Sequence, residues 1–333
     1  MMRMQLVRNV LVLSFVLAIV LAQSAAAQEK LPWKPLHEKV YFPAVIDSGK
    51  SVAFFKLEYD DKTAYSRLCV ADSKTGEEKI LFPDIDFNRD KLQAYSFMPD
   101  GDHVALVDKN LTLCDIWLHD CNDQYASPIR LTELEQFDPG IPIDQLYALG
   151  MNRKGVLEVK QLDISPDGKK IIMTFGILGK TAIWMYEIDR NHYRQMTPDR
   201  VGFLPKWMPD NEHFVYAMID SVSGNVGEDI WIMSAKTNEK TPLVQSGLSD
   251  GWPSPSADGK YVSYLEYNGK VWNVCVVRVS DRKTVRLTDF EAPTSCGYVI
   301  FNADGTGLLA TITTGPVEPM NLYEIPFDPE MFD

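Results

Sequence analysis

The sequence predicts an all-β protein, a six-bladed β-propeller of four-stranded antiparallel blades. Three observations predict it: a short turn phrase occurs six times, β-forming apolar residues follow each copy, and the copies recur at intervals of 43 to 67 residues. Self-similarity at such a period is typical of propellers and solenoids. The six turns are Asp47-Ser48-Gly49, Asp100-Gly101, Asp167-Gly168, Asp210-Asn211, Asp258-Gly259 and Asp304-Gly305.

The third copy shows the repeating unit most clearly. A short alternating segment ends at Pro166-Asp167-Gly168, a composition that reverses the chain. Residues 169–175, 182–188 and 193–197 then supply three further β-forming segments. Four short antiparallel strands in about 40 residues make one propeller blade. The blades are expected near residues 41–82, 93–132, 158–197, 202–245, 250–289 and 297–327.

The sixth repeat lacks residues for a fourth strand, because little of the sequence follows Leu322–Phe327. A sheet left open there would expose an edge, which closed propellers avoid. We therefore expect the mature N-terminus, within Lys30–Val40, to supply the outer strand of the last blade and to close the ring.

Residues 1–27 have the composition of a secretory signal peptide. Arg3 and Arg8 precede an apolar stretch, Val10–Ala22, and Ala25-Ala26-Ala27 offers a cleavage site. The stretch is short for a membrane span, which takes about 20 residues, although an uncleaved anchor is the alternative. The sequence predicts one propeller domain over 28–333, exported to the periplasm or beyond, with no membrane insertion after cleavage.

The charge balance excludes two classes of partner. The chain has 46 acidic and 33 basic residues, a formal net charge of −13, and loss of the two leader arginines makes it −15. Nucleic acids and anionic membranes both need clustered Lys and Arg, so neither is an expected partner. The five cysteines form no Cys-x-x-Cys motif, and the five histidines are scattered, so no metal ligands are predicted.

Two segments carry a resemblance to a known family. Ile164-Ser165-Pro166-Asp167-Gly168-Lys169-Lys170-Ile171 and Pro253–Val262 resemble the repeats of the TolB-type (WD-like) β-propeller family, and degenerate copies cover nearly the whole mature chain. The resemblance implies a propeller that docks proteins, and it extends to the propeller part of that family only. Related propellers precede the catalytic domain of prolyl-oligopeptidase-type enzymes, but no α/β-hydrolase segment with a G-x-S-x-G elbow follows the sixth repeat.

The irregular segments gather on the face opposite the Asp-Gly turns, at 83–92, 133–156 and 219–229. Long loops in compact folds are usually functional or disordered, and the longest one makes this face the expected binding surface. Acidic residues in the other two loops leave Ca²⁺ as a weak alternative to plain solvated loops. The candidate ligand- or partner-binding residues of the longest loop are Glu135, Asp138, Asp144, Tyr147 and Arg153.

The innermost strands offer a second location for a site. Counted back from the turns, Gln161 and Trp252 fall in one column, and Asp163 and Lys206 fall in the next. Asp163 and Lys206 come from adjacent blades at the same height, so we expect them to pair. Such a pair serves either as a structural salt bridge or in ligand binding.

Two functions follow from this pattern. The first is a non-catalytic binding module for a protein or peptide, with a glycan as another possible ligand and without a catalytic residue or a cofactor. The alternative is a carbohydrate-active or metal-dependent lyase or hydrolase with its site at the channel mouth. That alternative needs a carboxylate pair, for which Glu135, Asp163 and Asp250 are the candidates.

Overall fold

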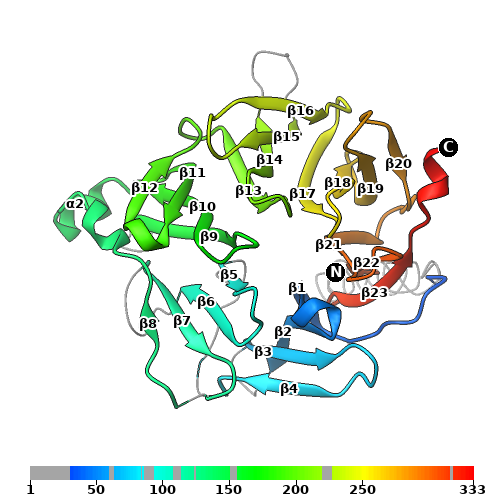
Figure 1. Cartoon of the computed structure of the whole chain (residues 1–333), viewed down its shortest axis with the longest axis horizontal. Coiled ribbons are helices and arrows are strands. Elements are labelled where there is room, and N and C mark those ends of the chain that lie inside the picture. The colour runs from blue at the N-terminus through cyan, green and yellow to red at the C-terminus, as the bar shows by residue number, and fades with distance from the viewer. Residues whose placement is uncertain are drawn as a thin grey trace, which may run out of the picture.

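Within the residues that the computed structural model describes, six β-sheets stand around a common axis in chain order (Figure 1). The described residues are 31–59, 64–83, 85, 94–107, 114–123, 125–150, 156–219, 227–315 and 318–333. The predicted six-bladed propeller is therefore confirmed. The predicted signal peptide lies outside the described residues.

The strands of each blade pair antiparallel in chain order, from the axis outward. Blade by blade they are β1 (Val40–Ile46), β2 (Ser51–Tyr59), β3 (Ala64–Asp72) and β4 (Glu78–Leu81); β5 (Tyr95–Phe97), β6 (His103–Val107), β7 (Ile116–Asp120) and β8 (Ile129–Arg130); β9 (Leu157–Ile164), β10 (Lys170–Ile177), β11 (Lys180–Glu187) and β12 (His192–Gln195); β13 (Gly202–Trp207), β14 (His213–Ile219), β15 (Glu228–Ser234) and β16 (Lys240–Val244); β17 (Ser249–Pro255), β18 (Tyr261–Tyr267), β19 (Trp272–Arg278) and β20 (Thr284–Arg286); and β21 (Ser295–Phe301), β22 (Gly307–Thr313) and β23 (Asn321–Pro326).

The Asp-Gly turns form because the aspartate side chain holds its own turn. Asp167 Oδ1 accepts a hydrogen bond from the backbone N–H of Lys169 at 3.1 Å, and Asp258 Oδ1 accepts one from Lys260 at 3.0 Å. The residue that follows each of the six aspartates has a positive φ, which favours glycine: it is 72° at Gly168, and the two exceptions to glycine are Ser48 at 52° and Asn211 at 60°. These carboxylates therefore build the turns, and the repeat encodes the fold rather than a chemical site.

The hydrophobic core is divided among the boundaries between blades. Six clusters of buried side chains each join two neighbouring blades, and the last one joins the sixth blade to the first. In that last cluster Phe54 and Cys69 of the first blade meet Leu309 and Leu322 of the sixth. The blades thus bury their flat sides against one another, and the contact between first and last blades closes the ring.

The predicted fourth strand of the last blade is not confirmed. The sheet of that blade has three strands, β21-β22-β23, among the described residues. Residues of the predicted closing segment do lie against β23, where Leu36 N–H donates to Leu322 O at 2.7 Å and Leu322 N–H donates to His37 O at 2.8 Å. They form an isolated bridge, His37 with Leu322, instead of a strand, because the chain turns at Val40 into the innermost strand of the first blade.

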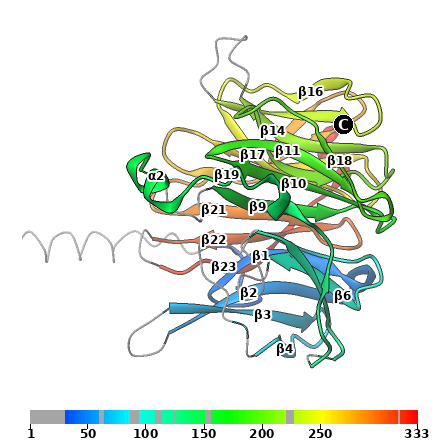
Figure 2. The same cartoon turned by 90° about the vertical axis from the view of Figure 1, so that its left-hand side faces the viewer.

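The long connection between the second and third blades carries two short helices, η3 (Leu134–Phe137) and α2 (Ile143–Ala148). Phe137 packs on Trp184 and Tyr193 of the outer strands β11 and β12, each with ring centroids 5.5 Å apart. In Figure 1 α2 lies at the outer edge of the disc, away from its axis, and in the edge-on view of Figure 2 it lies toward one face.

Candidate functional site

A cavity of about 640 Å³ lies on the propeller axis, lined by one strand from every blade. The strands are β1, β5, β9, β13, β17 and β21, the innermost of each sheet (Figure 1). Its volume falls in the range typical of small-ligand sites. Among its lining side chains are Phe42, Tyr95, Ser96, Gln161, Asp163, Leu204, Lys206, Trp252, Tyr298 and Asn302.

The mouth of the cavity lies on the face of the Asp-Gly turns. The lining extends to exposed turn residues, among them Asp47, Pro99, Pro166, Ala257 and Ala303. At the opposite end it reaches the first residue only of the short strand β5, Tyr95, and stops short of the first residues of the other five inner strands. The prediction gave the opposite, loop-bearing face as the first location for a site and the inner strands as the second, and this cavity lies at the second location. Short turns leave the axis uncovered, and sequence reasoning dismissed this face because its turns are uniform.

The floor of the cavity is formed by bulged segments of the inner strands. Phe42, Leu204 and Trp252 occupy one position in three blades, and each has a positive φ, between 49° and 57°. A proline follows each of them, and the pairing of all three inner strands shifts register at this point. A β-bulge of this kind redirects a side chain, here toward the axis.

Three aromatic rings meet on one side of this floor. The centroid of Trp252 lies 5.3 Å from that of Tyr298 and 6.1 Å from that of Phe42, and the rings of Phe42 and Tyr298 lie 5.5 Å apart, edge to face. The three residues come from the fifth, sixth and first blades, which are neighbours. They form a continuous aromatic wall, and the three side chains remain partly exposed.

The opposite side of the cavity carries an ion pair. Lys206 Nζ lies 2.8 Å from Asp163 Oδ1, and the other carboxylate oxygen accepts the backbone N–H of Trp207 at 2.8 Å. The predicted pairing of Asp163 and Lys206 is therefore confirmed. Burial opposes the charge on Lys206, but the carboxylate of Asp163 outweighs this and raises the pKa of Lys206 above its ordinary value. Lys206 is thus an ammonium at any physiological pH.

The structure separates the other predicted residues from this cavity. Of the predicted set, Gln161, Asp163, Lys206 and Trp252 line it. Glu135 lies in η3 beside Arg130, at 3.4 Å, and Tyr147 is an exposed residue of α2. Asp138 and Asp144 lie on the same peripheral connection. Arg153 lies outside the described residues, as do most of loops 83–92 and 219–229. Of the acidic residues considered there for Ca²⁺, Glu228 and Asp229 are described, and both belong to β15.

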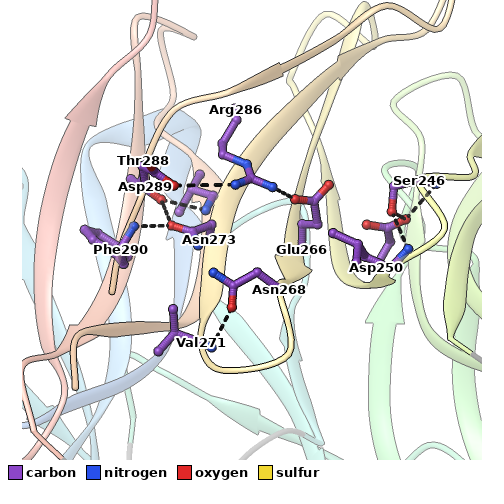
Figure 3. Close-up of polar contacts among 12 residues, drawn as sticks. Ser246, Asp250, Glu266, Asn268, Val271, Asn273, Arg286, Thr288, Asp289 and Phe290 are labelled. Atoms are coloured by element: carbon purple, nitrogen blue, oxygen red, sulfur yellow. Dashed lines mark hydrogen bonds and ion pairs between the residues drawn. The ribbon is translucent and has the colours of Figure 1, made fainter. Parts of the chain in front are cut away.

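Figure 3 shows a second polar group, inside the fifth blade and at its boundary with the fourth. Asp250 is fully buried, and its Oδ2 accepts a hydrogen bond from Ser246 Oγ at 2.7 Å, whereas no described residue hydrogen-bonds its Oδ1. Burial raises the pKa of Asp250 to about 6; the hydrogen bonds from Ser246 oppose the shift and the charge of Asp229 in the fourth blade adds to it. Farther along the sheet Arg286 pairs with Glu266.

In the second and fifth blades a buried latch joins the third strand to the segment that follows the fourth, and sequence reasoning missed it. In the fifth blade Asn273 Oδ1 accepts hydrogen bonds from Thr288 Oγ1, at 3.0 Å, and from the Phe290 N–H, at 2.6 Å (Figure 3). Asp115 occupies the same position in the second blade, where it accepts from Thr132 Oγ1 and the Leu134 N–H and pairs with Arg130. The sequence signal for this latch is the Leu-Thr dipeptide directly after the fourth strand, at Leu131-Thr132 and Leu287-Thr288.

The three carboxylates considered for a catalytic pair have separate surroundings. Asp163 binds Lys206 in the cavity wall, Asp250 binds Ser246 inside the fifth blade, and Glu135 lies at the rim. None of these contacts joins two of the three. In the part of the chain that the structure describes, no group of three or more His, Cys, Asp or Glu side chains is arranged to hold a metal ion.

One G-x-S-x-G pentapeptide, which sequence reasoning overlooked, does occur within the fifth repeat, at Gly247–Gly251. A nucleophile elbow places its serine on a sharp turn between a strand and a helix. Ser249 instead begins the inner strand β17, and its hydroxyl accepts the N–H of Glu228 at 3.4 Å. The five histidines all lie in other blades or at the N-terminal segment, so the pentapeptide is not an elbow.

No described helix is both long and apolar enough to cross a membrane.

The comparisons with known sequences give partial matches. No protein-family model matches the chain. A Tricorn-like protease C-terminal subunit of Sulfurisphaera tokodaii is 30% identical over 110 residues, which are 32% of this chain and 12% of that protein. An uncharacterized protein of Agrobacterium fabrum is 29% identical over 154 residues, 42% of this chain and 50% of that protein. The chain therefore spans half or less of the length of these relatives.

The solved structures show the fold. TolB from Acinetobacter baumannii superposes with a TM-score of 0.58 at 19% identity, covering 83% of this chain and 64% of that one. A TolB-like protein from Agrobacterium tumefaciens gives 0.56 at 16% identity, covering 87% and 91%. An oligogalacturonate lyase in complex with manganese gives 0.54 at 10% identity, covering 89% and 91%. At these identities the likeness concerns the fold alone: the chain is a six-bladed β-propeller, similar in fold to the propeller of TolB.

Proposed function

We propose that this protein is a non-catalytic binding propeller whose ligand site is the central cavity on the face of the Asp-Gly turns. The observation that carries the proposal is the cavity itself, about 640 Å³ and framed by all six inner strands. Apolar rings with a few convergent polar groups are the usual composition of a ligand site. Asp163 and Lys206 are bound to each other, so they are better placed to hold a ligand than to transfer protons.

The leader-like composition of residues 1–27 supports export of the protein. N-terminal sequencing of protein recovered from the periplasm and from the medium tests it directly.

Docking of a protein or peptide on the loop-bearing face remains a separate prediction. A pull-down with a variant that lacks residues 140–155 tests it, and unchanged recovery of partners would count against this face. The enzyme alternative has no described carboxylate pair to support it.

The cavity site is tested by filling it. Ala44 lines the cavity in the first blade, so Ala44→Trp blocks it, whereas Ile80→Trp places the same ring on an exposed position of the outer strand β4. Both variants and the parent protein are screened by thermal shift against a library of saccharides, small metabolites and short peptides. Compounds that stabilise the parent and the Ile80→Trp variant but not the Ala44→Trp variant support the cavity site. Compounds that stabilise all three equally place the site elsewhere and refute the proposal.

A further inference from the structure

The central cavity has two chemically different walls. The aromatic wall, Phe42, Trp252 and Tyr298, belongs to the fifth, sixth and first blades. The polar wall belongs to the third and fourth blades and holds the Asp163–Lys206 pair. A ligand that fills the cavity therefore meets flat apolar rings on one side and a paired donor and acceptor on the other.

The polar wall offers a hydrogen-bond donor and an acceptor side by side. Among the described residues, the ammonium of Lys206 donates only to Asp163, which occupies one of its three N–H groups. The side chain of Lys206 remains 29% exposed and that of Asp163 15% exposed, and both line the cavity. Hydroxyl groups both donate and accept, so neighbouring hydroxyls of one ligand match this pair.

The inner strands are poorly suited to bind an extended peptide by strand addition. Such recognition needs a regular row of free backbone N–H and C=O groups along a strand edge. Pro43, Pro205 and Pro253 remove an N–H at the same height in three inner strands. The pairing of β9 and β21 with their neighbours also shifts register. Recognition in the cavity therefore falls to side chains.

The charge around the mouth disfavours an acidic ligand. Asp47 lines the mouth, and the turn aspartates Asp167, Asp258 and Asp304 lie on the same face. Burial is the largest single effect on the pKa of Asp167 and Asp258 and opposes their ionisation, but hydrogen bonds within the turns and nearby lysines together outweigh it and lower both pKa values. For Asp304 the hydrogen bonds from Thr306 lower the pKa. Asp167, Asp258 and Asp304 are therefore ionised at neutral pH. Asp258 pairs with Lys260 at 3.1 Å and Asp47 with Lys50 at 3.5 Å, but acidic residues outnumber lysines in the six turns, so this face keeps a net negative charge that disfavours an anion.

We propose that the cavity binds a neutral pyranose oligosaccharide of two or three rings, with its C–H faces on Trp252 and Tyr298 and its hydroxyls on Asp163 and Lys206. The inference rests on the proposed cavity site and names its ligand class. A pyranose combines a flat apolar face with a rim of hydroxyls, which is the combination that the two walls present. Binding of such a ligand does not require backbone pairing with an inner strand.

The test uses the mature protein with three trisaccharides and a peptide set. Isothermal titration calorimetry is run with chitotriose and cellotriose as neutral probes, trigalacturonate as the acidic probe, and mixed-sequence hexapeptides as the competing class. Saturable binding of a neutral trisaccharide is expected. Trp252→Ala should weaken it at least about tenfold, and Trp252→Phe, which keeps a ring, should weaken it much less. Lys206→Met should also weaken it, whereas Trp231→Phe, on β15 and outside the cavity lining, should leave it unchanged.

Each result decides the inference. The inference is supported if a neutral trisaccharide binds and the Trp252 and Lys206 variants bind it more weakly than the parent and Trp231→Phe do. Circular dichroism must show that these variants are folded. If Trp252→Ala unfolds, the comparison is made between Trp252→Phe and Trp231→Phe. Tighter binding of trigalacturonate overturns the neutral class. Hexapeptides that bind in a Trp252-dependent manner while no saccharide binds overturn the inference but leave the cavity site standing. If no probe and no library compound binds in the cavity, both proposals fail.

Discussion

Gly49 marks the place where the first and last blades touch, and an alanine there is expected to destabilise the closed ring. Gly49 belongs to the first Asp-Gly turn and Ala303 to the last. A Cβ added at Gly49 would lie 1.9 Å from the Cβ of Ala303 and 3.4 Å from its Cα. The two turns are neighbours only because the ring is closed, so the substitution probes that closure directly.

The size of the effect follows from two contributions. Gly49 has a φ of +89°, and an alanine forced into the left-handed region costs about 1–2 kcal/mol. The overlap with Ala303 adds about 1–3 kcal/mol, the usual cost of an overpacked site. Gly49→Ala should therefore lower the free energy of unfolding by about 2–5 kcal/mol. Gly269 has the same φ of +89° with nothing within 4 Å of an added Cβ, so Gly269→Ala should show the first contribution alone.

The assay is urea unfolding followed by circular dichroism, with a double-mutant cycle. In an Ala303→Gly background the remaining contact of the new Cβ is the Cα at 3.4 Å, an ordinary van der Waals distance. Gly49→Ala should then cost no more than Gly269→Ala, which gives a coupling of about 1–3 kcal/mol between the two turns. If Gly49→Ala costs no more than Gly269→Ala in the parent protein, or if Ala303→Gly does not rescue it, the blades do not meet at this turn and the reasoning is refuted.

Two further predictions concern buried polar groups. The folded protein raises the pKa of Asp250 from 3.8 to about 6, so the contribution of this group to stability is fully present below pH 4 and is lost as the pH rises through 6. Asp250→Asn should therefore raise the free energy of unfolding at pH 8 by up to about 3 kcal/mol, and the variant should lose this advantage at pH 4. Urea unfolding at the two pH values measures both differences. A variant that is less stable than the parent at pH 8 contradicts the raised pKa of Asp250. Asp115→Ala should cost about 2–4 kcal/mol, because it leaves a buried N–H without its charged acceptor and removes one of the two carboxylates beside Arg130. Asn273→Ala, at the same position of the fifth blade, should cost about 1–3 kcal/mol, because it removes a neutral acceptor. Thermal and urea unfolding measure both losses, and equal or reversed losses would show that charge is not what distinguishes the two latches.

The fold could be predicted because its signal is local. An Asp-Gly turn depends on the side chain of one aspartate and the φ of the next residue. The six copies can therefore be recognised in the sequence without knowledge of distant contacts. The Asp163–Lys206 pair could also be predicted, because counting from these turns places both residues at one height in adjacent blades. The count of repeats and their common register were sufficient for both inferences.

The position of the cavity mouth could not be predicted in the same way. The location of the mouth depends on which end of the inner strands is left uncovered, and therefore on where the long connection between the second and third blades runs. That connection, with Glu135 and Tyr147, was expected over the binding face, but Phe137 anchors it on the outer strands β11 and β12. Such a contact joins residues far apart in the sequence, and no local pattern encodes it. The Pro that follows Phe42, Leu204 and Trp252 was a visible signal that was not used.

The strained residues at the cavity floor connect the fold to the proposed function. Phe42, Leu204 and Trp252 each adopt a positive φ at a cost of about 1–2 kcal/mol, although a glycine would adopt it without strain. The free energy of unfolding of a protein is about 5–15 kcal/mol, so the strain at three such residues is large relative to the net stability. The chain has glycine in this conformation at some positions, as at Gly168 and Gly259, and other residues at further positions, as at Leu178 and Arg200. What distinguishes the three bulges is that all three residues line the cavity, so the backbone shift at each bulge places a large side chain where the proposed function needs one.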